Sequence, residues 1–239
     1  MPLGEASVVQ CSKTAHTLLQ HLGTIMDRLP TLVIVAGLSS GAKVCTVSPS
    51  LTPSDNAVNA FDTLDSTLRM GLASGLPVLL VAPRSLGPRA RQLLPGNAVV
   101  DLPIAEDCKP HKIDQDFARA VVVGVLSSVN ANGWLILPAD IPMLKTDTLQ
   151  KVAAAMESQS IAYPQYRQMQ GHPIGFSPEL FSELIQVQTE RDLLRLMSRY
   201  PSLSVDVDDP GILMRNEFPN IPGRTYEKTN QKNERHFQQ

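Results

Sequence analysis

The chain has 239 residues, of which 43% are hydrophobic and 18% are charged. A chain of this length and composition can bury one large core, so we expect a soluble globular protein. The net charge of -2 argues against nucleic acid and anionic membrane as main partners, because binding to either is driven by a basic excess. The three cysteines are far apart and form no C-x-x-C pair, so they do not predict a structural zinc site.

The sequence also lacks the features of a membrane-embedded or exported protein. No apolar run approaches the roughly 20 residues that span a bilayer. The N-terminus has no charged segment followed by an apolar one, which is the pattern of a signal peptide. Since an odd number of separated cysteines favours a reducing compartment, we expect a cytoplasmic protein.

Helix and strand patterns alternate along the chain. Residues 6–28 carry apolar side chains mostly at three- and four-residue steps, which predicts an amphipathic helix, and the β-branched run 31–35 predicts a first buried strand. Further strands are predicted at 77–82, 98–102, 134–137, 160–163 and 204–207, and further helices at 58–74, 117–129, 178–187 and 191–200. Another helix is predicted after Thr146 or Asp147, either of which can cap it, and residues 164–173 are predicted as a polar turn.

This alternation is typical of βαβ units. The predicted fold class is therefore α/β, with a doubly wound, mostly parallel sheet that is covered on both sides. We expect an N-terminal amphipathic helical extension in residues 1–30 and one α/β domain in residues 31–224. Residues 225–239 are almost wholly polar, which predicts a disordered tail.

A buried strand in the middle of the chain is followed by an acid. Residues 134–137 carry no charge, as expected of a strand buried on both faces, and Pro138 has no N–H with which to continue the pairing. Asp140 therefore falls just past the strand, at the edge where open α/β sheets bind their ligands. A carboxylate there can hold a cation against a phosphate, and it can equally shape a turn or cap the next helix.

A glycine turn follows the first predicted strand. It reads Ala36-Gly37-Leu38-Ser39-Ser40-Gly41-Ala42-Lys43. The glycines allow close approach of the backbone, the serines offer hydroxyl groups and Lys43 can neutralise a phosphate, so the turn is similar to a phosphate cradle. It is not a Walker A loop, because three residues separate its glycines and Lys43 does not follow Gly41 directly. A plain turn after a strand is the alternative.

Four pieces of the chain carry a resemblance to a known family. They are Ile34 to Ser40, Pro138 to Pro142, Gly171-His172-Pro173, and Asp208-Asp209-Pro210 followed by Asn216-Glu217-Phe218-Pro219. In order, they resemble the Leu-Ala-Ala-Gly-x-Ser, Ala-Asp-Met-Pro, Gly-His-Pro and Asp-Ile-Asp-Thr-Pro segments of the molybdenum cofactor cytidylyltransferase branch of the MobA-like nucleotidyltransferase family. The resemblance covers about residues 32–220 and implies a Rossmann-like nucleotidyltransferase fold.

The resemblance also implies a reaction, in which a phosphate of molybdopterin attacks the α-phosphate of a nucleoside triphosphate and pyrophosphate leaves. The implied catalytic residues are Lys43 and Asp140, and the implied Mg²⁺ ligands are Asp140 and Glu217, with Asp208 or Asp209 as the alternative second acid. The nucleotide site implied is Ala36, Gly37, Ser39, Ser40, Gly41 and Arg84. His172 is implied to contact the pterin substrate or its phosphate, although a lone histidine can equally serve only local hydrogen bonds. The alanine before Gly37 favours CTP, since the guanylyltransferase relatives tend to have glycine there.

Two departures from the family pattern concern the implied site residues. Ser40-Gly41-Ala42-Lys43 lacks the Arg-Met-Gly that precedes the family lysine, and Glu217 stands where the family has aspartate. The loss of the arginine motivates a second hypothesis, a non-catalytic relative that binds the pterin cofactor or serves as a chaperone for a partner molybdoenzyme. A third is a nucleotidyltransferase of the same fold that acts on a sugar phosphate or a phosphoacid.

Overall fold

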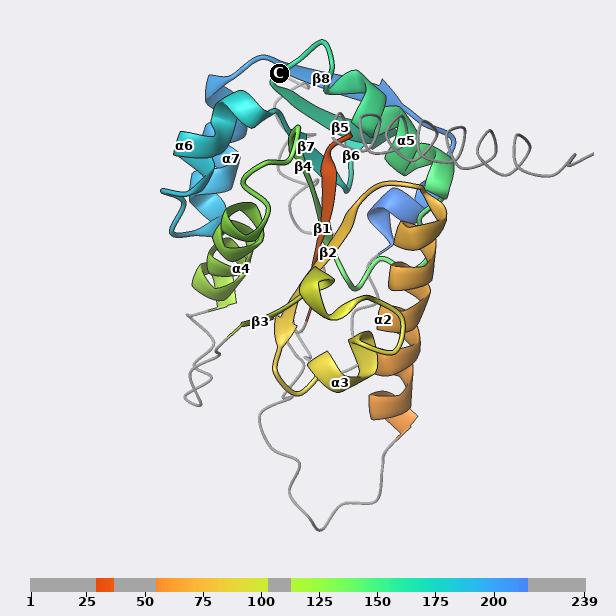
Figure 1. Ribbon diagram of the computed structural model, residues 1–239. Helices are drawn as coiled ribbons and strands as arrows, with labels where there is room; N and C mark the ends of the chain where they lie inside the picture. Colours follow the sequence, from red (N-terminus) through yellow and green to blue (C-terminus); the bar gives the residue numbers. More distant parts are fainter. Residues whose placement is uncertain (1–28, 37–54, 103–112, 215–239) are drawn as a thin grey trace, which may run out of the picture.

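A single mixed sheet runs through the residues that the computed structural model describes, 29–36, 55–102 and 113–214 (Figure 1). Its strands are β1 (Thr31–Val35), β2 (Val78–Pro83), β3 (Val99–Leu102), β4 (Trp134–Pro138), β5 (Ile161–Tyr166), β6 (Met169–Gln170), β7 (Ile174–Phe176) and β8 (Ser202–Asp206). Neighbouring strands follow the order β3-β2-β1-β4-β7-β5-β6, and β8 also pairs with β5. The helix predicted at 6–28 and the tail predicted at 225–239 lie outside the described residues.

The strands in the middle of the sheet are parallel. β1 pairs in parallel with β2 and β4, in a register that sets Val35 beside both Val81 and Pro138, and β2 pairs in parallel with β3. Every residue of β1 and of β4 is buried, because a central parallel strand is covered on both faces, and this accounts for their uncharged sequences. The predicted α/β class with a doubly wound, mostly parallel sheet is confirmed.

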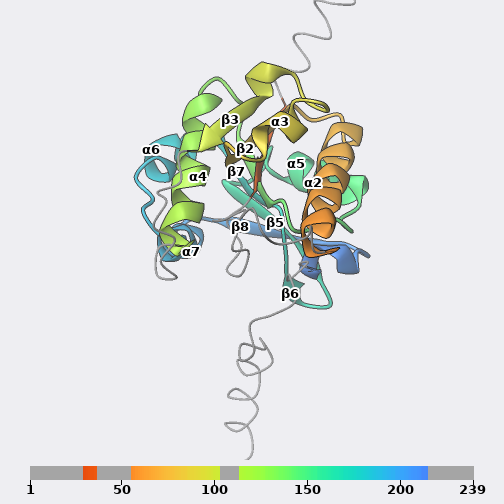
Figure 2. The ribbon, with the colours of Figure 1, turned by 90° about the horizontal axis from the view of Figure 1, so that it is seen from below.

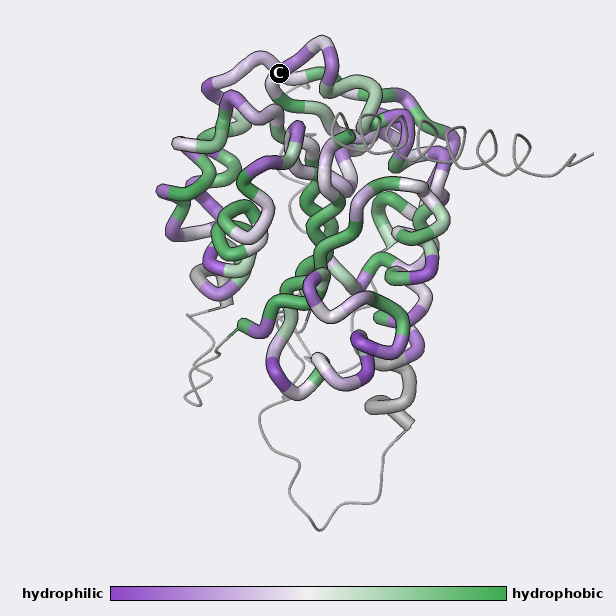
Figure 3. Tube along the Cα trace, in the orientation of Figure 1, coloured by the Kyte–Doolittle hydropathy of each residue, from purple (hydrophilic) through white to green (hydrophobic). Residues whose placement is uncertain are grey.

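Helices cover both faces of the sheet (Figure 2). They are α2 (Asp55–Ala73), α3 (Gly87–Ala90), α4 (Ile113–Ser127), α5 (Thr146–Ala155), α6 (Phe181–Leu184) and α7 (Glu190–Arg199), with 3-10 turns η1 (Gly96–Ala98), η3 (Pro178–Leu180) and η4 (Pro210–Leu213). Helices α2 and α5 bury Leu68 and Leu149 on one face, and α4 and α6 bury Val121 and Leu184 on the other. The central strands between them form the most hydrophobic part of the fold (Figure 3). No helix of the described segments is long and apolar enough to cross a membrane.

The end of the sheet beyond β4 differs from the sequence prediction. β7, which no pattern indicated, runs antiparallel between β4 and β5 and sets Ile174 beside Ile136. It has three residues with a central glycine, which is too short for an alternating pattern to show. Residues 164–173, predicted as a polar turn, instead contain the end of β5, a tight turn at Arg167-Gln168 with positive φ, and β6.

The prediction that Pro138 ends its strand was wrong. Pro138 belongs to β4 beside Val35, and the N–H of the next residue, Ala139, donates to Val35 O over 2.8 Å. Because successive residues of a strand point to opposite neighbours, the side of Pro138 that lacks an N–H faces away from β1. On that side the pairing of β4 with β7 stops at Ile136, so no ladder bond is lost.

Candidate functional site

The carboxyl ends of β1 and β4 meet where the strand order of the sheet reverses. β2 and β3 follow on one side of β1 and β4 lies on its other side, which is the position where open α/β sheets bind ligands. The Ala36 N–H donates to Val81 O over 2.9 Å, and the Ala139 N–H donates to Val35 O over 2.8 Å. Ala36 and Asp140 therefore lie at one edge of the sheet, beyond two strands that are paired in register.

The backbone before Asp140 is also held by a helix. Thr67 on α2 is fully buried, and its hydroxyl lies 2.9 Å from the carbonyl oxygen of Ala139 and 3.0 Å from that of Thr63. Ala139 is thus fixed through its N–H by β1 and through its carbonyl by α2. Asp140 is partly exposed as a residue, while its Oδ1 atom is buried. No sequence pattern indicates the role of Thr67, which looks like any other position on the buried face of α2.

The antiparallel strand β7 returns the chain to the same edge. Since β7 sets Ile174 beside Ile136 and runs against β4, continuing that register places His172 at the edge where Asp140 lies. The His172 N–H donates to Ile212 O over 3.2 Å, and the Nδ1 atom of its ring is buried. The topology therefore brings Asp140 and His172 to one edge of the sheet.

A buried aspartate from beyond β8 holds the segment after Asp140. Asp209 is only 2% exposed. Its carboxylate accepts hydrogen bonds from the Lys145 N–H over 2.9 Å, the Thr148 hydroxyl over 2.7 Å and the Gly211 N–H over 2.9 Å. Charge-assisted bonds of this kind compensate for the burial of a carboxylate.

These bonds correct two expectations. The N-cap of α5 is Lys145, which makes no side-chain capping bond, so neither Thr146 nor Asp147 caps the helix. Asp209, considered as an alternative metal ligand, instead binds protein donors at the start of α5 and in η4. Asp208 is exposed, and its carbonyl oxygen accepts from Lys145 Nζ over 2.7 Å.

The other predicted site residues divide into two groups. Gly37, Ser39, Ser40, Gly41, Lys43 and Glu217 lie outside the described residues. Arg84 is described, and it is an exposed residue that directly follows β2. Because β2 is parallel to β1, Arg84 lies at the same edge of the sheet as Ala36. The structure thus brings Ala36, Arg84, Asp140 and His172 to one edge.

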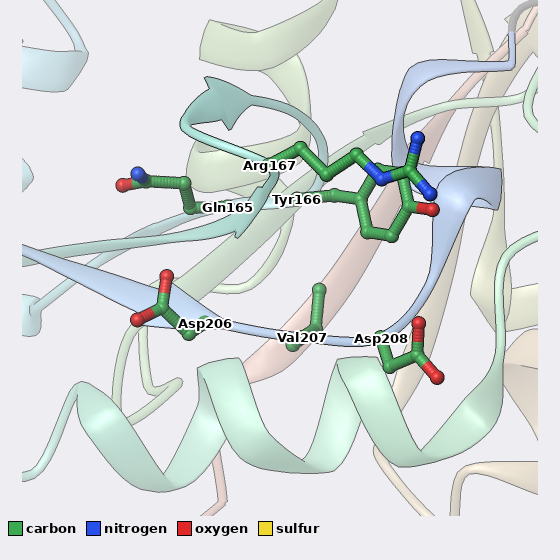
Figure 4. A pocket seen from close by; sticks show the side chains of 6 residues that line it. All are labelled: Gln165, Tyr166, Arg167, Asp206, Val207 and Asp208. Carbon is green, nitrogen blue, oxygen red and sulfur yellow. The ribbon is translucent and has the colours of Figure 1, made fainter.

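An open pocket of about 450 Å³ lies at the ends of β5 and β8 (Figure 4). It is lined by Gln165, Tyr166, Arg167, Asp206, Val207 and Asp208. The Arg167 guanidinium stacks on Tyr166, 5.1 Å from the ring centroid, and Figure 4 shows this pair across the pocket from the carboxylates of Asp206 and Asp208. Both strands run parallel to β4, so the pocket lies at the same edge of the sheet as Asp140. The polar turn predicted at 164–173 was the only sequence signal for this pocket.

A protein-family model matches the chain. Residues 63–204, more than half of the chain, match the family described as the MobA-like NTP transferase domain. The chain belongs to this family. The matched segment of this MobA-like protein runs from α2 to β8 and includes Asp140 and His172. Among curated proteins, none matches the sequence.

Solved structures show the same fold as this MobA-like chain. Rv0371c from Mycobacterium tuberculosis is 22% identical, with a TM-score of 0.56 over 86% of this chain and 98% of that one. A nucleotidyl transferase from Methanothermobacter is 16% identical, with a TM-score of 0.55 over 87% and 99%. A 4-diphosphocytidyl-2C-methyl-D-erythritol synthase from Anaerococcus prevotii is 11% identical, with a TM-score of 0.51 over 89% and 98%. At these identities the likeness concerns the fold, which is that of nucleotidyltransferases.

Proposed function

We propose that this chain transfers CMP from CTP to molybdopterin in the biosynthesis of the molybdenum cofactor. An oxygen of the terminal phosphate of the pterin forms a bond to the α-phosphorus of CTP. The bond from that phosphorus to the bridging oxygen breaks, and pyrophosphate leaves with the electron pair. Family membership supports nucleotidyl transfer, and the resemblance to the cytidylyltransferase branch, which includes Ala36-Gly37, supports this donor and this acceptor.

The observation that carries the proposal is the position of Asp140 where the strand order reverses. Phosphoryl-type transfer depends on alignment and charge neutralisation more than on a nucleophilic side chain. Alignment requires a rigid support, and the residue before Asp140 is fixed by β1 at its N–H and by Thr67 at its carbonyl. The backbone that leads into Asp140 is therefore held by a strand and by a helix that pack together in one core.

The oxygen ligand at this position fits Mg²⁺. Among the described residues, no three acidic, histidine or cysteine side chains are grouped so as to hold a metal. Mg²⁺ is commonly bound by one or two carboxylates together with waters and substrate phosphates, which is what Asp140 offers at a phosphate site. We propose Asp140 as one ligand and Glu217 as a second. When bound, the ion would neutralise charge on the phosphate oxygens.

The order of the strands suggests how the acceptor lies. Along the sheet edge, β4, β7 and β5 are consecutive, so His172 falls between Asp140 and the pocket at the ends of β5 and β8. A pterin ring presents adjacent N–H donors, and a carboxylate such as that of Asp206 can accept hydrogen bonds from them. The ring can also stack on Tyr166 and Arg167. Its phosphate would then extend past His172 towards Asp140. Ala36, the proposed turn 37–43 and Arg84 are on the other side, where we place CTP.

Binding and turnover test the proposal together. The protein is titrated with Mg·CTP by calorimetry, and pyrophosphate release is measured with CTP, GTP or ATP in the presence of molybdopterin and Mg²⁺. We expect release with CTP, and its loss in Asp140→Asn. The matched control is Asp147→Asn, since Asp147 is an exposed acid paired with Lys151 on the surface of α5. The proposal is wrong if no nucleotide supports release, or if both variants lose activity equally.

The second candidate function is a non-catalytic pterin-binding or chaperone protein for a molybdoenzyme, motivated by the missing arginine in 40–43. It predicts no heat of binding with Mg·CTP but retained binding of molybdopterin. It further predicts that Asp206→Asn weakens pterin binding while Asp140→Asn does not.

We also propose the domain division expected from the sequence, with a helical extension in 1–30, the transferase domain in 31–224 and a tail in 225–239. Limited proteolysis would test it by releasing a stable fragment that begins near residue 30. A stable fragment that keeps the first residues would contradict the division.

A further inference from the structure

We propose that Asp209 is a positioning residue that sets the segment after Asp140 against the turn that carries His172. This inference rests on the proposed function, because it assigns Asp209 a role in the nucleotidyltransferase site. Asp209 itself is not a ligand or a catalytic residue. Its carboxylate is committed to three donors, and it acts through the two segments that it joins.

The first of these segments is the connection from Asp140 to α5. Asp209 accepts from the Lys145 N–H at the N-cap of α5 and from the Thr148 hydroxyl within the first turn of the helix. The side chain of Lys145 adds a third bond in the same direction, because its Nζ donates to Asp208 O over 2.7 Å. Three hydrogen bonds thus join the end of the connection from Asp140 to α5 with the chain that follows β8.

The second segment is the turn before β7. Asp209 accepts from the Gly211 N–H and so fixes the start of η4. Within η4, Ile212 O accepts from the His172 N–H over 3.2 Å. A Cβ added at Gly171 would lie 2.6 Å from Ile212 O, and one added at Gly211 would overlap the Met143 carbonyl. Backbone therefore packs directly on backbone on both sides of η4.

The sequence distance between Asp209 and its donors distinguishes a positioning residue from an ordinary helix cap. An ordinary cap comes from the helix's own N-terminus, as in α7, where Thr189 and Asp192 form a capping box three residues apart. In α5 the acceptor is Asp209, which is 61 residues from Thr148 in the sequence. A local cap would stabilise α5 equally well, whereas only a distant one also fixes η4 and, through it, the His172 turn. Neither segment can shift without breaking bonds to Asp209 or η4.

The test compares Asp209→Asn with Asp192→Asn, which removes a similar carboxylate cap on a helix that packs on the other face of the sheet. Amide exchange is measured in the free protein, and Mg·CTP binding and pyrophosphate release are measured in the same preparations. The decisive amide is that of His172, because its acceptor is Ile212 O and not Asp209. We expect its exchange to accelerate by about tenfold in Asp209→Asn and to be unchanged in Asp192→Asn.

Turnover provides the second readout. We expect kcat to fall by about tenfold in Asp209→Asn, with KM for CTP changed less. The reason is that misplacing the pterin substrate relative to CTP affects the transition state more than the binding of either substrate. If Asp209→Asn fails to fold, Thr148→Val removes one of the three bonds, and Thr148→Ser, which keeps the hydroxyl, is its rescue.

Unchanged His172 exchange in Asp209→Asn or Thr148→Val would overturn the proposal, and so would an equal kcat loss in Asp192→Asn. If the wild-type protein shows no turnover, the proposed function fails, while the exchange data still decide whether Asp209 sets the His172 turn.

Discussion

The bond from Thr67 to the Ala139 carbonyl can be removed with little change in shape by substituting Thr67→Val. Both side chains are β-branched, and Thr67 is fully buried. Inside α2 the Thr63 carbonyl keeps its helical N–H partner, so the group left without its donor is the Ala139 carbonyl, which Thr67 approaches to 2.9 Å. A buried carbonyl deprived of its donor costs roughly 1–3 kcal/mol, and the added buried methyl offsets about 0.8 kcal/mol. We expect a net loss of about 0.2–2 kcal/mol in the free energy of unfolding.

The single tryptophan provides the assay. Trp134 lies in β4 and is 1% exposed, so its emission should shift to longer wavelength as the sheet unfolds. Urea and thermal unfolding of wild type, Thr67→Val and Thr67→Ser give the stability change, with roughly 2–4 °C in Tm for each kcal/mol. Mg·CTP affinity is measured in parallel, because the Ala139 carbonyl belongs to the peptide that joins Asp140 to β4.

A second buried hydroxyl on the chain after α2 serves as the matched control. Ser74 is 4% exposed, directly follows α2 (Asp55–Ala73), and its hydroxyl donates to Gly71 O over 2.6 Å and not to the segment before Asp140. We expect Ser74→Ala to lower stability without changing Mg·CTP affinity, Thr67→Ser to resemble wild type, and Thr67→Val to lower both. Wild-type stability in Thr67→Val would refute the reasoning, and equal affinity losses in Thr67→Val and Ser74→Ala would refute the link to the site.

Three further outcomes follow from individual residues. Gly171→Ala should destabilise the fold by roughly 1–3 kcal/mol, because the new Cβ would lie 2.6 Å from the backbone oxygen of Ile212, and an unchanged urea midpoint would contradict this. Arg84→Ala should weaken Mg·CTP binding by about tenfold at constant Tm, since Arg84 is exposed at the sheet edge; unaltered calorimetric affinity would exclude it from the nucleotide site. The hydrogen bond from the Thr189 side chain lowers the pKa of Asp192 below its ordinary value of 3.8. The Asp192 carboxylate therefore stabilises the fold at a pH above its unfolded-state pKa. This stabilisation is lost as the pH falls through the lower pKa of the folded state. Asp192→Asn should therefore lower the free energy of unfolding at neutral pH. It should also make the fall of that free energy with acidification shallower than in wild type. Parallel plots of unfolding free energy against pH for wild type and Asp192→Asn would count against this role of Asp192.

Much of the fold could be predicted because burial constrains the sequence locally. β1 and β4 are uncharged runs because they are covered on both faces, and the helices show their apolar spacing for the same reason. The order of elements then places Asp140 at the carboxyl edge of a doubly wound sheet, whereas His172 reaches that edge through β7, which no sequence pattern indicated. The resemblance to a MobA-like family rests on the same short motifs and agrees with the family match over residues 63–204.

By itself, then, the sequence determined which segments are buried and which chemical groups follow them. Only the tertiary structure decided how those groups are held. The antiparallel position of β7, the bond from Thr67 to Ala139 and the three bonds to Asp209 all join residues that are distant along the chain. Such bonds depend on register and packing across the sheet, not on the spacing of neighbouring residues, so they leave no periodic pattern from which a sequence could predict them.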